Sequence, residues 1–216
     1  MTSLVLLFVG AVLLINGLVF LGVIDAKSST AINLLVGLFL AGTVLFLVLP
    51  VRGTDEASLG IILGASGFLL FSFTYLGVAF NNLAGAHGAA LGWYCGWAAL
   101  ISMFLAAINF SHLADHRVGW LWASWSLLFL AFFLSLALKV EWMTAPAGAL
   151  AIMQAFITCT VPAALQMTGL WTTVPVSAIA AAQIIMTAIL VWHVRSSRRT
   201  WTGQKLDLQL ASAVAQ

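Results

Sequence analysis

The chain has 216 residues, of which 63% are hydrophobic and 6% charged, and its formal net charge is +2. A soluble domain carries about one quarter charged residues, so eight basic and six acidic side chains cannot cover a chain of this size. Together with a mean hydropathy of +1.12, these values exclude a water-soluble globular protein and indicate an integral membrane protein. The basic residues form no patch outside the C-terminal tail, and we expect no nucleic-acid partner.

Long apolar runs follow one another along the chain. A bilayer core of about 30 Å is crossed by a helix of about 20 apolar residues, and seven runs meet this length, at residues 3–24, 31–50, 58–80, 89–110, 119–139, 147–167 and 172–193. The connections between them are short, and no recurring alternation of polar and apolar residues suggests strands. The sequence therefore predicts an all-α integral membrane protein with a bundle of about seven transmembrane helices.

The fifth run is the richest in aromatic residues, and helical spacing places Trp122, Trp125 and Phe129 on one of its faces. The other runs supply side chains that would complete a passage with this face, namely Val9, Leu13, Asn16, Phe71, Tyr75 and Gln154. An aromatic stripe is also typical of core packing or of an interfacial belt, and a buried amide is also typical of an interhelical hydrogen bond. We interpret the set as the lining of a narrow, uncharged passage that suits a small planar amide.

No acid or base lies near the centre of any apolar run. Ion-coupled transporters and proton pumps place ionisable groups at mid-membrane, and a retinal protein needs a lysine that the seventh run lacks. This pattern favours passive passage of a neutral solute.

One cluster of catalytic residue types stands outside the apolar runs, at His112, Asp115 and His116. It leaves open a membrane enzyme, although a solvated helix end explains the same residues. A seven-helix sugar facilitator is a further alternative, which predicts an internal repeat that we do not find. Cys95 and Cys159 lie inside apolar runs without metal-ligand spacing and are expected to act as small buried hydrophobes.

Four stretches carry a resemblance to a known family: LLFVGAVLLINGLVFLG at 6–22, DAKSSTAINLLVG at 25–37, GFLLFSFTYLGVAFNN at 67–82 and LAIMQAFITCTVPA at 150–163. With the tryptophan-rich fifth run, they resemble the AmiS/UreI family of bacterial urea channels and short-chain amide transporters over about residues 1–167. The resemblance implies a homohexamer in which each protomer has its own channel through six helices. The run at 172–193 would then be one C-terminal helix added to the six-helix family core.

The resemblance also implies roles for single residues. Asn16 matches the channel-lining amide, Phe71 and Tyr75 match the pore aromatics, and Trp122 and Trp125 match two channel tryptophans. Helical spacing adds Val9 and Leu13 to the face of Asn16, so the whole predicted lining is Val9, Leu13, Asn16, Phe71, Tyr75, Trp122, Trp125, Phe129 and Gln154. Phe129 stands where urea channels have a further tryptophan, and Gln154 where they have a glutamate, which leaves room for aliphatic amides. The loop VRGTDEAS is short and has no histidine, so His112 and His116 are the candidate pH sensors.

The cations predict the orientation of the chain. With the N-terminus outside, six of the eight lysines and arginines fall on the inner side: Lys27, Lys139, Arg195, Arg198, Arg199 and Lys205. We expect residues 1–193 to form the transmembrane channel domain and residues 194–216 a cytoplasmic tail, partly disordered or on the membrane surface. The expected protein is a passive channel of the bacterial inner membrane, without enzyme activity, cofactor or metal. It would supply urea or a short-chain amide to a cytoplasmic urease or amidase.

Overall fold

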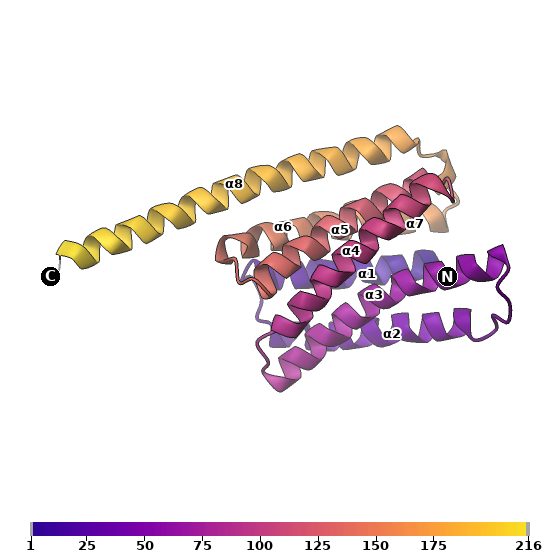
Figure 1. Ribbon diagram of the computed structural model, residues 1–216, viewed down its shortest axis with the longest axis horizontal. Coiled ribbons are helices and arrows are strands. Elements are labelled where there is room, and N and C mark those ends of the chain that lie inside the picture. Colours follow the sequence, from indigo (N-terminus) through magenta and orange to yellow (C-terminus); the bar gives the residue numbers. More distant parts are fainter. Residues whose placement is uncertain (1, 215–216) are drawn as a thin grey trace.

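The computed structural model describes residues 2–214 and consists of helices joined by short loops (Figure 1). Its α-helices are α1 (Thr2–Phe20), α2 (Thr30–Val48), α3 (Glu56–Ala84), α4 (Ala89–Ser111), α5 (His116–Leu136), α6 (Thr144–Gln154), α7 (Val161–Met167) and α8 (Val176–Val214). Short turns of helix lie at Lys27–Ser29, Glu141–Met143 and Trp171–Thr173. Seven spans are long and apolar enough to cross a membrane, and no strand occurs within residues 2–214. The predicted fold class is confirmed.

The sixth span, Glu141–Met167, changes its winding halfway along. Between α6 and α7, residues Ala155–Thr160 form a π-helix, in which the backbone N–H of Val161 donates to the carbonyl of Phe156. Pro162 follows directly at the start of α7. Proline lacks the N–H group that an α-helix needs and clashes with the preceding turn, and the wider winding accommodates it. Pro162 therefore changes the winding of this span without ending it.

The spans pack as antiparallel neighbours: α4 lies along α5, α2 along α3, and α1 along α6 and α7. From α1 to α6, several neighbouring pairs share a buried or half-buried hydrogen bond from a polar side chain. These bonds are Asn16 to Asn33, Ser72 to the Gly37 carbonyl, Tyr94 to the Leu70 carbonyl, Ser126 to the Ala99 carbonyl and Gln154 to the Ser124 carbonyl. Between α1 and α6 the contact is made by glycine instead, because a Cβ on Gly17 would lie 2.8 Å from the carbonyl oxygen of Gly148.

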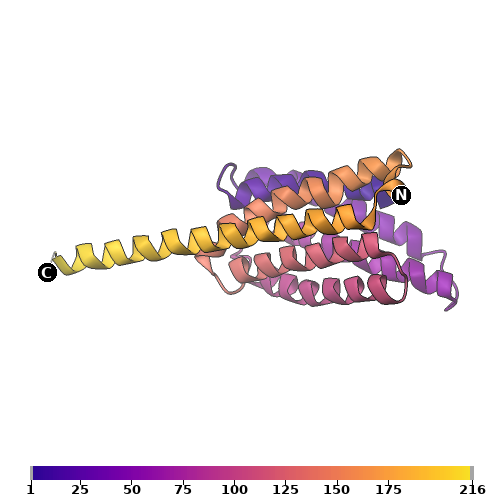
Figure 2. The ribbon, with the colours of Figure 1, turned by 90° about the horizontal axis from the view of Figure 1, so that it is seen from above.

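The last helix leaves the bundle. We call the end where α1 begins the N-terminal end, and the end where α1 finishes the opposite end. α8 starts at the N-terminal end, runs along the bundle and projects beyond the opposite end (Figures 1 and 2). At 1.5 Å per residue its 39 residues span about 58 Å, which exceeds the bilayer core. The structure thus describes residues 194–214 as a continuation of the seventh helix, where the sequence suggested a partly disordered or surface-bound tail.

Candidate functional site

Five predicted lining residues meet in one aromatic cluster at the middle of the bundle. Phe71 lies at its centre, with ring centroids 5.1 Å from Trp125, 5.3 Å from Phe129, 6.1 Å from Tyr75 and 6.2 Å from Trp122. Trp122 and Trp125 also meet edge to face at 4.8 Å. All five side chains are buried. The aromatic residues that helical spacing places on one face of α3 and one face of α5 therefore contact each other in the structure.

Gly67 allows α3 and α5 to come this close. A Cβ at position 67 would lie 2.7 Å from Cη2 of Trp122 and closer still to Cζ2. The ring of Trp122 thus rests against bare backbone one turn before Phe71. Any larger residue at position 67 would displace this ring.

A chain of hydrogen bonds holds Trp125 in place from the sixth span. The indole N–H donates to Oγ1 of Thr158 at 3.0 Å, and the Thr158 hydroxyl donates to the backbone carbonyl of Gln154 at 2.7 Å. The side-chain amide of Gln154 donates in turn to the carbonyl of Ser124 at 2.8 Å. This chain crosses the junction where the π-helix begins, and such π segments are frequent at functional sites. Thr158 is therefore the residue that orients Trp125.

The buried polar atoms that make no hydrogen bond with any described residue include Oε1 of Gln154 and the hydroxyl of Tyr75. Both side chains are at most 1% exposed. A buried polar group without a partner costs about 1–3 kcal/mol. These two atoms therefore retain free hydrogen-bonding capacity inside the protein.

The three predicted residues of α1 face the same interior. Val9, Leu13 and Asn16 are at most 7% exposed. Asn16 forms a reciprocal amide pair with Asn33 of α2, with Nδ2–Oδ1 distances of 2.9 and 2.7 Å, and Nδ2 of Asn33 also donates to the carbonyl of Ser29. Asn16 is thus both an interhelical bridge and a lining residue, where the sequence left the two readings as alternatives.

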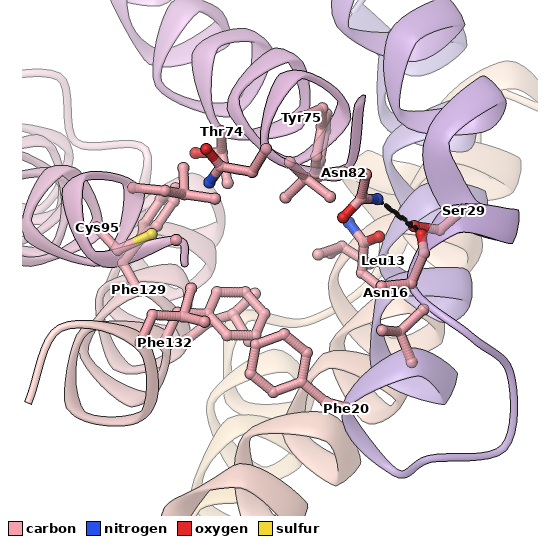
Figure 3. A pocket seen from close by; sticks show the side chains of 18 of the residues that line it. Leu13, Asn16, Phe20, Ser29, Thr74, Tyr75, Asn82, Cys95, Phe129 and Phe132 are labelled. Carbon is pink, nitrogen blue, oxygen red and sulfur yellow. Dashed lines mark hydrogen bonds between the residues drawn. The ribbon is translucent and has the colours of Figure 1, made fainter. Parts of the chain in front are cut away.

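A cavity of about 210 Å³ runs from this cluster to the opposite end of the bundle (Figure 3). Phe71, Tyr75 and Phe129 form its inner limit, together with Leu13 and Asn16 of α1. Trp122, Trp125, Gln154 and Val9 do not line it; they lie buried beyond, toward the N-terminal end. In this conformation the aromatic cluster closes the interior between the cavity and that end.

The outer part of the cavity is lined by residues that the sequence analysis did not single out as lining. They include Phe20, Ser29, Asn81, Asn82, His87 and Phe132, whereas Thr74 lies deeper, next to Tyr75. Asn82 donates from Nδ2 to the carbonyl of Ala26 at 2.7 Å and to Oγ of Ser29 at 3.3 Å, which ties α3 to the loop after α1. Polar groups therefore gather on the side of α1, α2 and α3, while Phe132 and Phe129 present rings on the side of α5 (Figure 3). Asn81 and Asn82, at the end of the third apolar run, were the feature of the sequence that could have predicted this polar lining.

The histidine cluster lies at the N-terminal end, away from this cavity. His112 contacts Ser111, with an Oγ–Nδ1 distance of 2.8 Å, and His116 stacks on Phe110. Asp115 caps α5 by accepting a hydrogen bond from the backbone N–H of Val118. Both histidines are exposed. Each of the three side chains has its own separate contact, so the geometry does not assemble a catalytic or metal-binding group from them.

We predict that Thr158→Val releases Trp125. The replacement keeps the shape of the side chain but leaves the buried indole N–H without an acceptor, which should cost about 1–2 kcal/mol of unfolding free energy. It should also shift the tryptophan fluorescence, because the indole loses its fixed environment. Thr43→Val is the matched control, since the buried Thr43 hydroxyl donates only to the Phe39 carbonyl of its own helix. Equal spectra and equal stability in the two variants would contradict the orienting role.

Comparison with known proteins assigns this arrangement to a family. The sequence profile described as AmiS/UreI family transporter matches residues 1–170. The chain is 37% identical over 175 residues to a Rhodococcus erythropolis protein named as the transporter AmiS2, which covers 81% of this chain and 83% of the relative. It is 32% identical to the acid-activated urea channel of Helicobacter pylori (strain ATCC 700392 / 26695), covering 79% of this chain and the full length of that channel.

Solved structures agree with the sequence match. The crystal structure of the urea channel from Helicobacter pylori superimposes with a TM-score of 0.68 at 29% identity, covering 79% of this chain and 99% of that one. The cryo-electron microscopy structure of the Helicobacter pylori urea channel in its closed state gives a TM-score of 0.69 at 27% identity. The profile match ends at residue 170, before α8 begins. The chain is a multi-pass membrane protein that belongs to the AmiS/UreI family of transporters.

Proposed function

We propose that the protein is a passive channel for urea and short-chain aliphatic amides. The observation that carries this proposal is the amphipathic cavity that ends on a buried, uncharged aromatic cluster. Small planar molecules fit between ring faces and edges, and a few amides and hydroxyls replace part of their water shell. A hydrated ion would find too few polar partners there. The family match and the named relatives support a transport role and favour neither the enzyme nor the sugar facilitator.

The residues of the site have distinct roles in this proposal. Asn16 offers its amide at the inner part of the cavity, where it is held by Asn33. Phe71, Tyr75 and Trp125 form the narrow part, which must open by a small rotation of rings for a solute to pass. The Tyr75 hydroxyl and the side-chain oxygen Oε1 of Gln154 then form hydrogen bonds with an amide that has lost its water shell. Gln154 and Phe129 favour acceptance of aliphatic amides beside urea, because both differ from the residues of urea channels.

We further propose the setting in which the channel works. The excess of cations at the opposite end of the bundle supports a cytoplasmic location for that end, and the cavity of Figure 3 would then face the cytoplasm of a bacterium. Protomers assemble into a homohexamer of the inner membrane, each with its own passage. The solute is consumed inside by an amidase or urease, while the protein itself performs no chemistry.

Uptake by cells tests the passive character. Cells that express the protein should take up labelled acetamide and urea at initial rates proportional to the outside concentration. Dissipation of the proton gradient should leave these rates unchanged, because no acid or base lies near the middle of any span and His87 lines only the outer part of the cavity. If the uptake rates fell to the background level when the proton gradient is dissipated, the protein would be a proton-coupled carrier and not a passive channel.

We predict that acid does not open the passage. His112 and His116 are exposed at the N-terminal end and have no contact with the aromatic cluster, so their protonation changes only the charge at the mouth. Flux of urea should be similar at pH 5 and pH 7 in the wild type and in the double variant His112→Gln/His116→Gln. Flux confined to acid in the wild type, and lost in the variant, would make these two histidines the sensor.

A further inference from the structure

The seventh span is held to the bundle near each of its ends, and Leu190 and Val194 are half-buried against the core between them. Near the N-terminal end, Ile179, Gln183 and Met186 of α8 are buried against it. Past the opposite end, Nε1 of Trp201 donates to Oε2 of Glu141 at 3.0 Å, and the guanidinium of Arg198 lies 5.9 Å from the ring centre of Trp142. Between these attachments most of α8 is exposed.

A crevice of about 630 Å³ separates α8 from α5 in this middle part. Its walls are mainly apolar, with Ala123 and Leu127 from α5 and Ala188, Val191 and Trp192 from α8. The polar groups Ser124, Gln183 and Thr187 lie toward the N-terminal end, and Arg195 lies at the other end. From residue 183 to residue 195 the crevice follows α8 for about 18 Å, which exceeds the depth of one leaflet in a bilayer core of about 30 Å. It therefore has the length and the apolar wall of a groove for one acyl chain.

Positive charge is concentrated where this crevice reaches the membrane surface. Arg195 lines both the crevice and a second hollow, which also includes Arg198, Arg199, Thr202 and Gly203. No carboxylate lines either hollow within the described residues. Arginine binds phosphate through several N–H groups at once. The charge thus selects an anionic group at the same end where an acyl chain would leave the crevice.

We propose that this crevice is a binding site for an anionic phospholipid of the leaflet at the opposite end. One acyl chain fills the space between α5 and α8, and the phosphate is held by Arg195, Arg198 and Arg199. The lipid then links α8 to the bundle between its two attached ends. The run of arginines beside the apolar groove fits the phosphate and acyl chain of a lipid, and a second copy of the chain is distinguished from it by the experiment below. The proposal does not depend on which solute crosses the channel.

Native mass spectrometry of the full-length protein tests the site. The protein is titrated with dioleoyl phosphatidylglycerol or dioleoyl phosphatidylcholine in the same detergent. We expect tighter binding of phosphatidylglycerol, and about fivefold weaker binding for each arginine removed from the set Arg195→Gln, Arg198→Gln and Arg199→Gln. Lys27→Gln is the matched control, because Lys27 is an exposed cation at the same end of the bundle that does not line the crevice.

A second pair of variants tests the crevice itself. Ala188→Phe places a ring in the crevice and should abolish the preference for phosphatidylglycerol. Ile185→Phe adds similar bulk to an exposed face of α8 outside the crevice and should leave it intact. Equal binding of both lipids, or an unchanged preference in the arginine and Ala188 variants, would overturn the proposal. A change in the number of protomers with Ala188→Phe, without loss of bound lipid, would overturn it in favour of a second copy as the occupant.

Discussion

Trp125→Ala is expected to remove the size selectivity of the channel and to lower its stability. Trp125 is 6% exposed, packs edge to face against Phe71 and Trp122, and donates to Thr158. Its loss leaves a cavity in the narrowest part of the interior. Truncation of a buried tryptophan costs about 3–5 kcal/mol of unfolding free energy. We expect glycerol flux to rise about tenfold relative to urea flux, because the rings no longer exclude the bulkier solute.

The measurement is stopped-flow light scattering on proteoliposomes, with unfolding followed separately in detergent. Trp97→Ala is the matched control, since Trp97 is a 53% exposed tryptophan near the middle of α4 and should leave selectivity unchanged. Trp125→Phe keeps a ring but loses the indole N–H, and should give an intermediate ratio. A Trp125→Ala protein that is folded and still excludes glycerol as the wild type does would show that this cluster is not the selective part.

Asn16→Leu is expected to lower both stability and flux. The change removes two interhelical hydrogen bonds and leaves the fully buried amide of Asn33 with the Ser29 carbonyl as its remaining partner. Interhelical polar contacts in membranes contribute about 0.6–1.7 kcal/mol, and an unpartnered buried amide adds to the cost. We therefore expect a loss of about 2–3 kcal/mol. The initial rates of urea and acetamide entry should fall, because the cavity loses its inner amide.

A double-mutant cycle separates the pair from its surroundings. Asn16→Leu/Asn33→Leu should be less destabilised than the sum of the single variants, because neither partner is then left alone. Asn109→Leu is the control, because the buried Asn109 donates only to the Leu105 carbonyl of its own helix. If the loss of unfolding free energy in the double variant equalled the sum of the losses in the two single variants, the two amides would not be coupled.

Local patterns in the sequence account for the helices and for the aromatic cluster. Apolar runs of sufficient length predict seven spans because the bilayer imposes that length, and all seven are found. Helical spacing places Phe71 and Tyr75 on one face and Trp122, Trp125 and Phe129 on another, and these faces meet. Side-chain periodicity alone, however, is more typical of a packed core or an interfacial belt than of a passage.

Contacts between distant residues were beyond such patterns. Nothing local shows that Asn33 is the partner of Asn16, or that Asn82 reaches the loop after α1. A proline inside an apolar run indicates a disturbed helix but does not show whether the helix ends, kinks or widens, and here it widens into a π-helix. The cavity depends on where side chains of several spans stop filling the interior. The long continuation of α8 was also missed, because polar residues after position 193 end the apolar pattern without ending the helix.

Stopped-flow light scattering on proteoliposomes at neutral pH tests the central claim most directly. Vesicles that contain the wild-type protein should be far more permeable to urea and acetamide than protein-free vesicles, with glycerol permeability close to the protein-free level. That result would establish a selective passive channel and rank its solutes. Urea and acetamide permeability equal to that of protein-free vesicles, from protein shown to be folded, would contradict the channel.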